Sequence, residues 1–307
     1  MEKRQTPEIL DYRNENGHGW SFYINDGVLR RVVTTPEDDM EMIRNVQKLE
    51  LRDDDVMIAA YPKCGTHWLW EIVTMLRAGN SEYHNKPKEI AMLGMPKYER
   101  ADELPSPRVL NSHLYLRHLP EKLVEKQIKT IFVMRNPKDV SVSYYHHVNG
   151  LKQSLGFEGT YSEYLDLFLK GKVSSGCYFD YLKDWQQVKQ DNPDLPILTL
   201  FYENLKKDPV KNIKEVAEFI GESVTEELCE QIAEACSFKK LKVAATDVKE
   251  ELPNGNRSEV WKEGHEGMYR KGEVGDWKNW ITVAQDERFD DVIDRKFEAK
   301  GIVFTYE

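Results

Sequence analysis

Four short segments consist almost entirely of apolar or β-branched residues, which is the pattern of strands buried on both faces of a parallel sheet. They are VMIAA at 56–60, RVLNS at 108–112, TIFVM at 130–134 and ILTLF at 197–201. At least two of them lead into helical patterns. The hydrophobic pattern therefore predicts strands that alternate with helices.

The first helical pattern follows the strand at 56–60. Its apolar positions recur at helical spacing, and Gly79 after them predicts a C-cap. Those positions are Trp68, Ile72 and Met75, with Leu69, Val73 and Leu76 beside them. The strand at 130–134 leads into RNPKDVSVSYYHH, where Pro137 suits a first helical turn and Asp139 suits the N-terminal dipole.

This alternation predicts an α/β fold, with a central parallel sheet flanked by helices in one domain over residues 1–307. Segments 210–221 and 225–236 also have helical patterns. Residues 242–269 are polar and contain proline and glycine, so we expect a long loop there. Loops of that length are uncommon unless they are functional or disordered.

Composition and charge narrow the function. The formal net charge is -10 and the pI about 5.5, which argues against a general nucleic-acid binder. The four cysteines are scattered without zinc-site spacing, as expected for reduced thiols in a cytosolic protein. Neither a signal-like N-terminus nor a run of membrane-spanning length is present, so we expect a soluble cytoplasmic protein without membrane partners.

The stretch YPKCGTHWLW at 61–70 joins the first strand to the first helix, and such a junction aims backbone N–H groups at an anion. Lys63 precedes Gly65, whereas the loop of nucleotide triphosphatases, GxxxxGK[ST], has its lysine after the last glycine. So short a loop suits a single phosphate better than a triphosphate. An ordinary strand–helix turn with an exposed lysine is the alternative.

Two further segments carry basic residues next to glycine or a helix start. RNPKDVSVSYYHH has Arg135 at a strand end and Ser143 in the following helix. YRKGEVGDWKNWIT has Arg270 and Lys271 before Gly272. Arginine binds phosphate bidentately, and hydroxyl and amide donors complete such a site. Each segment alone is typical of a solvated turn, but their combination indicates a nucleotide phosphate site.

With these motifs in this order, the chain resembles the cytosolic sulfotransferases. YPKCGTHW is similar to the family's YPKSGTTW loop, RNPKDVSVSYYH to its 3'-phosphate segment, and RKGEVGDWKNWIT to its RKGxxGDWKNxFT signature. VLNSHL and FYENLKKDP match the family's KTHL and FYEDMKxxP. The core motifs cover about 56–289. The resemblance implies a P-loop-like sulfotransferase fold and transfer of a sulfuryl group from 3'-phosphoadenosine 5'-phosphosulfate (PAPS) to a small-molecule alcohol, phenol or amine.

The resemblance also implies roles for individual residues, with PAP as the product nucleotide and no metal ion. The residues expected to bind the 5'-phosphosulfate are Lys63, Cys64, Gly65, Thr66 and His67. Those expected to bind the 3'-phosphate are Arg135, Ser143, Arg270, Lys271 and Gly272. Those expected around the adenine are Trp68, Tyr202, Ser237 and Phe238.

For catalysis, His113 at the end of the second strand is the candidate general base, because an ordinary histidine is largely neutral at cellular pH. Lys63 is expected to meet the oxygen on which charge grows as the bond to sulfur breaks, and Ser143 is a further candidate. Asn111 stands where the family has lysine. We expect it to donate an uncharged hydrogen bond to the transferring group, which predicts slower turnover.

The acceptor site and the oligomeric state rest on weaker patterns. Residues 1–50 are expected to contribute to the acceptor pocket, with Trp20, Phe22 and Tyr23 as walls, and with His147 and Asn149 as its more polar part. KNWITVAQDE fits the family's KxxxTVxxxE dimer motif through Lys278, Thr282, Val283 and Glu287. A two-fold dimer is the corresponding expectation.

Two alternatives to an active sulfotransferase stay open. Asn111 also fits a nucleotide-binding scaffold that has lost catalysis. A small-molecule kinase or nucleotide triphosphatase with an aberrant loop is disfavoured by the lysine order and by the lack of a strand-end aspartate for magnesium.

Overall fold

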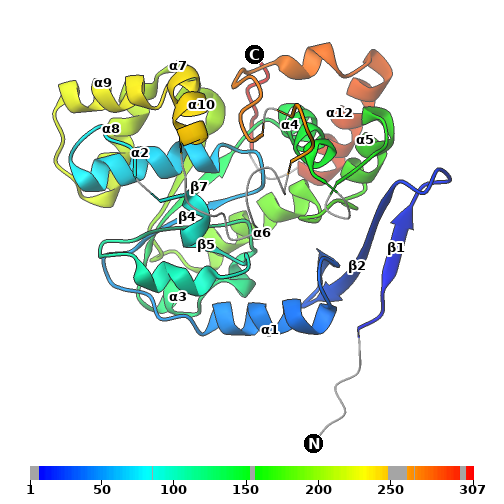
Figure 1. Cartoon of the computed structure of the whole chain (residues 1–307), viewed down its shortest axis with the longest axis horizontal. Coiled ribbons are helices and arrows are strands. Elements are labelled where there is room, and N and C mark those ends of the chain that lie inside the picture. The colour runs from blue at the N-terminus through cyan, green and yellow to red at the C-terminus, as the bar shows by residue number, and fades with distance from the viewer. Residues whose placement is uncertain (1–6, 85, 153–155, 248–260, 266, 298–301) are drawn as a thin grey trace, which may run out of the picture.

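A five-stranded parallel sheet lies at the centre of the molecule, in the order β5-β6-β4-β7-β8 (Figure 1). The computed structural model describes residues 7–84, 86–152, 156–247, 261–265, 267–297 and 302–307. The strands of this sheet are β4 (Val56–Ala60), β5 (Met92–Leu93), β6 (Val109–Ser112), β7 (Lys129–Met134) and β8 (Ile197–Phe201). All four predicted strands are confirmed. The two-residue edge strand β5 is too short to leave a hydrophobic pattern.

Helices pack around this sheet in two groups (Figure 1). One group gathers around α2 (Thr66–Ala78), with α7 (Tyr202–Lys207), α8 (Pro209–Ile220), α9 (Glu226–Ala235) and α10 (Phe238–Asp247). The other contains α4 (Pro137–Gly150), α5 (Tyr161–Leu169) and α12 (Val283–Phe297). The remaining elements are α1 (Pro36–Gln47), α3 (Lys122–Glu125), α6 (Tyr178–Asp191), η1 (Lys88–Ala91), η2 (Tyr98–Glu103), η3 (Leu116–His118) and η5 (Asp276–Asn279).

The predicted end of the helix after β4 and the predicted start of the helix after β7 are confirmed. Helix α2 ends at Gly79, which adopts a left-handed conformation with φ 66° as a C-cap. Helix α4 has Pro137 in its first turn, and the side chain of Asn136 caps it by accepting the amide of Asp139. These junctions fix the backbone at the carboxyl edge of the sheet.

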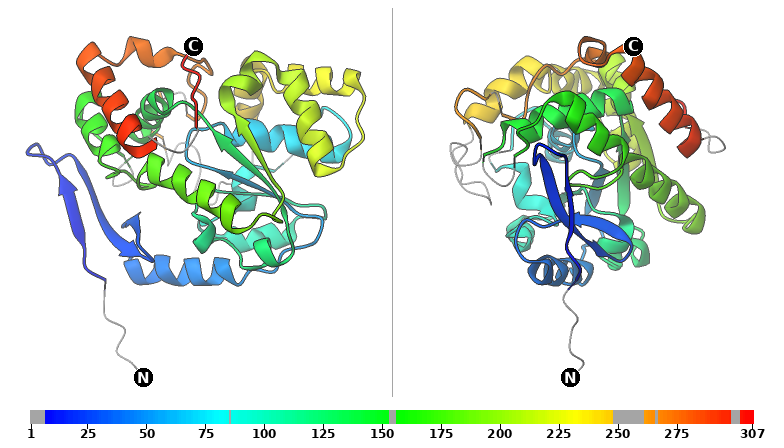
Figure 2. Two further views of the ribbon diagram at one scale, coloured as in Figure 1. Left: turned by 180° about the vertical axis from the view of Figure 1, so that it is seen from behind. Right: turned by 90° about the vertical axis from the view of Figure 1, so that its right-hand side faces the viewer.

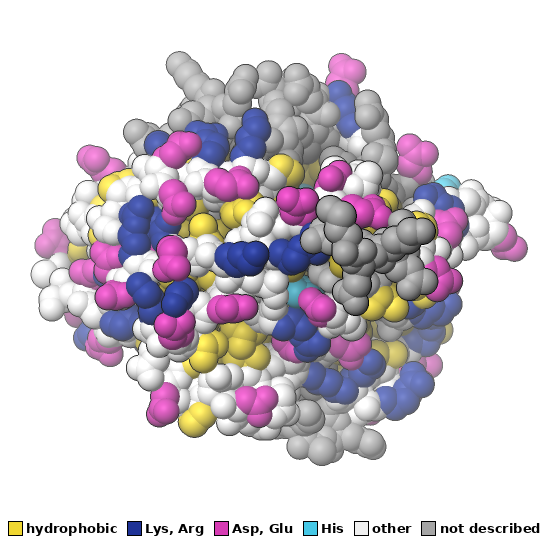
Figure 3. Space-filling model, turned by 90° about the horizontal axis from the view of Figure 1, so that it is seen from below, with side chains coloured by type: hydrophobic (Ala, Val, Ile, Leu, Met, Phe, Trp, Pro, Cys, Tyr) yellow, Lys and Arg dark blue, Asp and Glu magenta, His cyan; other side chains and the backbone are white. Residues whose placement is uncertain are grey.

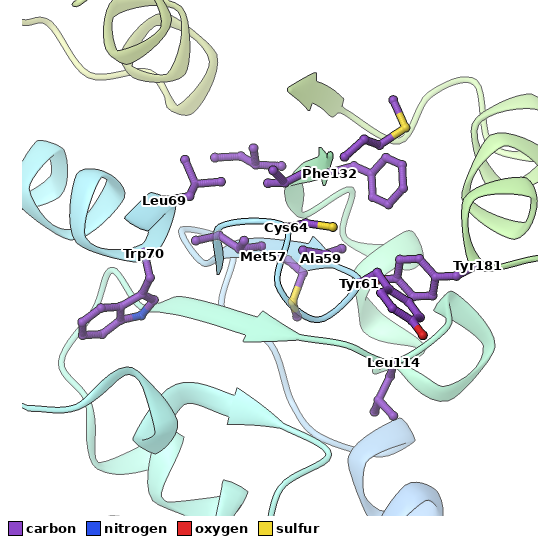
Figure 4. Close-up of a cluster of buried hydrophobic side chains, with 14 of the residues drawn as sticks. Met57, Ala59, Tyr61, Cys64, Leu69, Trp70, Leu114, Phe132 and Tyr181 are labelled. Atoms are coloured by element: carbon purple, nitrogen blue, oxygen red, sulfur yellow. The ribbon is translucent and has the colours of Figure 1, made fainter. Parts of the chain in front are cut away.

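The core between sheet and helices is apolar and closely packed. Met57 and Ala59 of β4 and Phe132 of β7 are almost fully buried, and Leu69 and Trp70 of α2 pack with them (Figure 4). Burial of a large apolar side chain contributes roughly 1.5–3 kcal/mol each, so this core holds the strand ends rigidly.

The N-terminal segment forms a separate antiparallel sheet that the hydrophobic pattern did not predict. Strands β1 (Leu10–Arg13), β2 (Gly19–Asn25) and β3 (Val28–Arg31) pair in that order and lie beside α5 at one side of the molecule (Figures 1 and 2). Asn14 and His18 both contact the carboxylate of Glu163 on α5. This sheet packs on the helical layer rather than extending the central sheet.

One sequence expectation is partly wrong. The predicted loop over 242–269 begins inside a helix, because α10 continues to Asp247. The helix forms because Leu241 is buried on its inner face at helical spacing from the cavity-lining Phe238. Residues 248–260 and 266 of the predicted loop lie outside the described residues.

The surface and the helix lengths add little about partners. On the face shown in Figure 3, basic and acidic side chains lie next to one another over most of the area. Of the helices described, none combines the length and the apolar character that a bilayer crossing requires.

Candidate active site

Four neighbouring strands place chemically active residues at one edge of the sheet. Since β6, β4, β7 and β8 are parallel, their carboxyl ends lie side by side. His113 follows β6, Lys63 follows β4 by three residues, Arg135 follows β7 and Tyr202 follows β8. We call these four residues the strand-end cluster.

The loop after β4 is anchored to the fold by Tyr61, and most of its other residues line a cavity. The ring of Tyr61 is buried, and its hydroxyl donates to the carbonyl of Gly176 at 2.7 Å. Lys63 has a φ of 71°, a left-handed conformation that is strained for a residue with a side chain. Gly65 has a φ of 101°, and a Cβ there would lie 2.9 Å from the ring of Tyr202. Glycine is therefore required at this turn.

Arg135 ties this loop to the later 270–277 segment. Its guanidinium donates to the carbonyl of Lys63 at 3.2 Å and to that of Glu273 at 3.0 Å. Its Cζ lies 4.2 Å from the centroid of the Tyr202 ring. One side chain thus bridges three parts of the chain.

The carboxylate of Asp139 fixes the 270–277 segment against α4. It accepts the amides of Gly275 at 2.9 Å and Trp277 at 3.0 Å. Arg270 and Lys271 precede this anchor, and both form ion pairs with Asp276. Arg270 and Lys271 line the same cavity as Lys63, although they are about 200 positions from Lys63 in the sequence.

Positive charge accumulates where these segments meet. Burial, followed by the charges of Arg135, Lys88 and Arg270, lowers the pKa of Lys63 to about 7. Two buried polar atoms here, Oγ1 of Thr66 and Nε of Arg135, have no hydrogen-bond partner among the described residues. The first N–H groups of helix α2 have no intrahelical acceptor, and no side chain caps them. The arrangement fits an anion with several oxygens.

His113 is oriented by a single strong contact. Its Nδ1 lies 2.6 Å from the carbonyl oxygen of Ala60. A carbonyl accepts only, so Nδ1 carries the proton and Nε2 keeps its lone pair. Burial, and then the nearby charge of Lys88, lowers the pKa of His113 to about 3. His113 is therefore neutral at cellular pH, with a free acceptor nitrogen.

One cavity of about 920 Å³ joins these groups. Its lining includes most of the residues predicted from the sequence motifs, namely Lys63, Gly65, Thr66, His67, Trp68, His113, Arg135, Ser143, His147, Tyr202, Ser237, Phe238, Arg270, Lys271 and Gly272. Gly272 is again required, because a Cβ there would lie 2.3 Å from the ring of Phe238. The volume is sufficient for a nucleotide together with a small second molecule.

Comparison with known proteins decides the family. The model of the sulfotransferase domain family matches residues 53–301. The chain belongs to the cytosolic sulfotransferase family. Human sulfotransferase 1C2 is 40% identical over 276 residues, covering 85% of this chain and 89% of the relative. Rat sulfotransferase 1A1 is 37% identical over 260 residues, covering 81% and 87%.

Solved structures agree with the sulfotransferase fold. The crystal structure of mouse sulfotransferase SULT7A1 complexed with PAP has a TM-score of 0.72 at 29% identity and covers 91% of this chain and 96% of that one. Retinol dehydratase has the same TM-score of 0.72 at 18% identity, which shows the shared fold alone. The chain is thus a sulfotransferase enzyme of the P-loop-like α/β fold.

Two motif residues do not reach the cavity of this sulfotransferase. Cys64 is buried below the loop, beside Tyr61 (Figure 4), and its amide donates to the carbonyl of Tyr61 at 3.3 Å. Asn111 is fully buried, and its Nδ2 donates to the carbonyls of Lys88 and Ala91, each at 3.1 Å. The expectation that Asn111 donates to the transferring group is therefore wrong, because both amide protons are already bonded inside the fold.

The predicted aromatic walls are also wrong. Trp20, Phe22 and Tyr23 are buried in the core and do not line the cavity. On β2, Nε1 of Trp20 donates to the carbonyl of Gly156, whereas the hydroxyl of Tyr23, on the other face of the strand, donates to Asp39 of α1. The amide of Asn149 donates to the carbonyl of Phe157 instead of facing the cavity. The expected contribution of residues 1–50 to the pocket is not found for residues 7–50, none of which lines the cavity, and residues 1–6 lie outside the described residues.

The cavity wall contains residues that no motif identified. Lys88 and Glu89 of η1 line it, together with Met92, Met95 and Trp261. The carboxylate of Glu89 contacts Nε2 of His67 at 3.0 Å. We call Lys88, Glu89, His67 and Asn111 the η1 cluster. Residues 86–95 follow neither a strand nor a helix period, so the sequence alone carried no signal for this wall.

The residues of the expected dimer motif lie at the surface. Val283 is 77% exposed, and the ammonium of Lys278 pairs with Glu307 at 2.7 Å. Thr282 and Glu287 are exposed as well. Elsewhere in the described part of the chain, no cluster of three or more His, Cys, Asp or Glu side chains is arranged to hold a metal ion.

Proposed function

We propose that this enzyme transfers the sulfuryl group of PAPS to a hydroxyl group, of a phenol or an alcohol, or to an amine of a small molecule, with His113 as the general base. The observation that carries the proposal is the meeting of Lys63, Arg135 and Arg270 with His113 in one cavity. Three cations and a neutral imidazole suit a doubly anionic nucleotide and an acceptor that must lose a proton.

The donor set of the site fits PAP and PAPS. Lys63, Thr66 and the first amides of α2 suit the 5'-phosphate, and the unpartnered Oγ1 of Thr66 is a donor that a phosphate oxygen would satisfy. Ser143, Arg270 and Lys271 suit the 3'-phosphate, where Arg135 also contributes its unpartnered Nε. Trp68 and Phe238 are the flat apolar surfaces in the lining that suit an adenine ring, with Tyr202 and Ser237 beside them.

The protonation state of His113 supports its role as base. Nε2 is the free acceptor because Nδ1 donates to Ala60, and the lowered pKa keeps the ring neutral. In the proposed in-line transfer, the acceptor oxygen bonds to sulfur while its proton moves to Nε2 of His113. The bond between sulfur and the bridging oxygen breaks, and Lys63 stabilises the charge left on that oxygen. When bound, PAPS supplies the sulfuryl group.

The acceptor itself is proposed only by class. The lining of the cavity also includes apolar side chains, Met92, Met95 and Trp261, together with His147. Such a wall suits a small aromatic or aliphatic molecule with one reacting hydroxyl. We therefore keep a phenol or an alcohol as the proposed acceptor.

A transfer assay separates this function from its alternatives. Radiolabelled sulfate transfer from PAPS to an acceptor panel is measured with and without a chelator. We expect transfer that the chelator does not change. Tight PAP binding without transfer to any acceptor would instead favour a scaffold that has lost catalysis. Magnesium-dependent use of ATP would favour a kinase or nucleotide triphosphatase, and either result would overturn the proposal.

The oligomeric state and the cellular location are proposed from fewer observations. Exposure of Val283 beside Lys278 supports a homodimer through the KxxxTVxxxE segment. Light scattering that gives a monomer at micromolar concentration would contradict it. We also propose that residues 1–307 act as one domain in the cytoplasm, as the scattered, free cysteines suggest.

A further inference from the structure

Two of the positions where the chain departs from its family's motifs, Asn111 and His67, are in contact with one short segment. At Asn111, Oδ1 accepts the ammonium of Lys88 at 3.3 Å. At His67, Nε2 contacts Glu89 at 3.0 Å. Lys88 and Glu89 are adjacent residues of η1. Both departures therefore belong to one local rearrangement, the η1 cluster.

Lys88 is an unusual lysine. Its side chain is 3% exposed, yet it lines the cavity together with Lys63 and His113. The contacts of its ammonium are long: the amide oxygen of Asn111 at 3.3 Å, the sulfur of Met92 at 3.3 Å and a carboxylate oxygen of Glu89 at 3.7 Å. Burial lowers the pKa of Lys88, so an anionic partner, which its ammonium has protons to bind, favours its charged form.

The charge of Lys88 also acts on the reacting groups. After burial, it is the next cause that lowers the pKa of His113 and of His67, and it contributes to the lowered pKa of Lys63. Its field therefore reaches the place between the general base and the loop lysine. The acceptor oxygen, the sulfur and the leaving oxygen must lie along that line in an in-line transfer.

We propose that Lys88 is a further catalytic residue, whose ammonium reaches the transferring sulfuryl group from η1 and supplies the cation that Asn111 lacks. The inference rests on the proposed function. A lysine at position 111 would bring a second ammonium against that of Lys88, whereas an asparagine accepts from Lys88 and holds it. Glu89 is a positioning residue, because its carboxylate pairs with Lys88 and accepts from His67.

The first test replaces the charge. We expect Lys88→Met to lower kcat for sulfate transfer about 10²–10³-fold, the usual effect of removing one donor to a developing charge. PAP affinity should stay within about threefold, because PAP has no sulfuryl group, while PAPS affinity falls more. Lys88→Arg should keep a larger part of the rate. Lys97→Met makes the same substitution at an exposed position of the following loop and should change none of these values.

The second test places the positive charge at position 111 of strand β6 in place of position 88. Lys88→Met combined with Asn111→Lys should recover at least about tenfold in kcat over Lys88→Met alone, because one ammonium again lies beside the cavity.

A third test measures the pKa of His113 by NMR titration. In nucleotide-free protein, that pKa should be higher in Lys88→Met than in the wild type. The other groups that act on His113, namely His67, Lys63, His147 and the Ala60 carbonyl, are unchanged in that variant.

The outcomes separate this inference from the proposed function. If the wild-type protein binds PAPS and transfers sulfate, but Lys88→Met keeps its kcat and its ratio of PAPS to PAP affinity, the role of Lys88 is wrong and the function stands. If the wild-type protein binds neither PAP nor PAPS, the function itself is wrong. Should Lys88→Met not fold, Lys88→Arg and the double variant decide by the same ratio.

Discussion

The strand-end cluster and three members of the η1 cluster, His67, Lys88 and Glu89, line one cavity, but the two clusters are built differently. Lys63, Arg135, Tyr202 and His113 each follow a strand of the parallel sheet, so the order of the strands brings them together. The η1 cluster joins helix α2, strand β6 and the 3-10 helix η1 through contacts of side chains with other side chains and with a backbone carbonyl. The first arrangement follows from the fold, whereas the second depends on the particular side chains at these positions.

This difference changes how missing motif residues are interpreted. From the sequence, Asn111 suggests a lost charge and slower turnover. In the structure, the amide of Asn111 is fully bonded inside the fold, and a buried lysine stands next to it. A motif residue can thus be absent while its charge arrives from another segment.

The largest expected effect concerns the strand-end cluster. His113→Ala should lower kcat about 10²–10⁴-fold, roughly 3–5 kcal/mol in the barrier, because the acceptor loses its base. PAP affinity, measured by calorimetry, should remain near that of the wild type. His18→Ala changes a histidine in the turn between β1 and β2 and should leave kcat unaltered. An active His113→Ala enzyme would remove the imidazole from the mechanism.

A smaller effect is expected for nucleotide binding. Arg135→Met should weaken PAP about 10- to 100-fold, roughly 1.5–3 kcal/mol, because a charge-assisted phosphate contact is lost and the loop loses its tie to Glu273. Arg288→Met is the matched control, because Arg288 lies on the surface of α12 and pairs with Asp166 of α5. Equal PAP affinities for both variants would show that Arg135 only supports the fold.

The pKa of Lys63 predicts how PAP binding changes with pH. Burial and neighbouring cations lower this pKa to about 7 in the nucleotide-free enzyme, while a bound phosphate should raise it. Below pH 7 the lysine is charged in both states. Above pH 7 binding must take up a proton, so PAP affinity should fall by up to about tenfold per pH unit. Calorimetry from pH 6 to 9 measures this slope. Lys63→Met should bind PAP weakly and without this pH dependence. An identical slope in both proteins would show that Lys63 is not the group that takes up the proton.

The smallest expected effect checks the N-terminal sheet. Trp20→Phe removes the hydrogen bond to the Gly156 carbonyl and should lower the free energy of unfolding by about 1 kcal/mol. Because Trp20 lies outside the cavity, the KM for any acceptor should not change. Denaturant unfolding and acceptor kinetics measure the two quantities. A changed KM for the acceptor at an unchanged free energy of unfolding would indicate that Trp20 contacts the acceptor.

The sequence predicts the strand-end cluster and the central sheet well for a physical reason. Buried parallel strands such as 56–60 and 130–134 leave continuous apolar runs, and the residues after them must lie at one edge. The two-residue strand β5 and the contacts of Lys88 leave no such period. Likewise, Trp20 is apolar whether it lines a pocket or a core, so only tertiary packing decides its position.

The most direct test of the central claim is a calorimetric titration of PAP into the wild-type protein and into Lys63→Met and Arg270→Met. The two loops that carry these residues are far apart in the chain but face one cavity. We predict one PAP per chain without added metal, and a weaker affinity in each variant. Unchanged affinity in either variant, or a site that accepts ATP only with magnesium, would contradict the account.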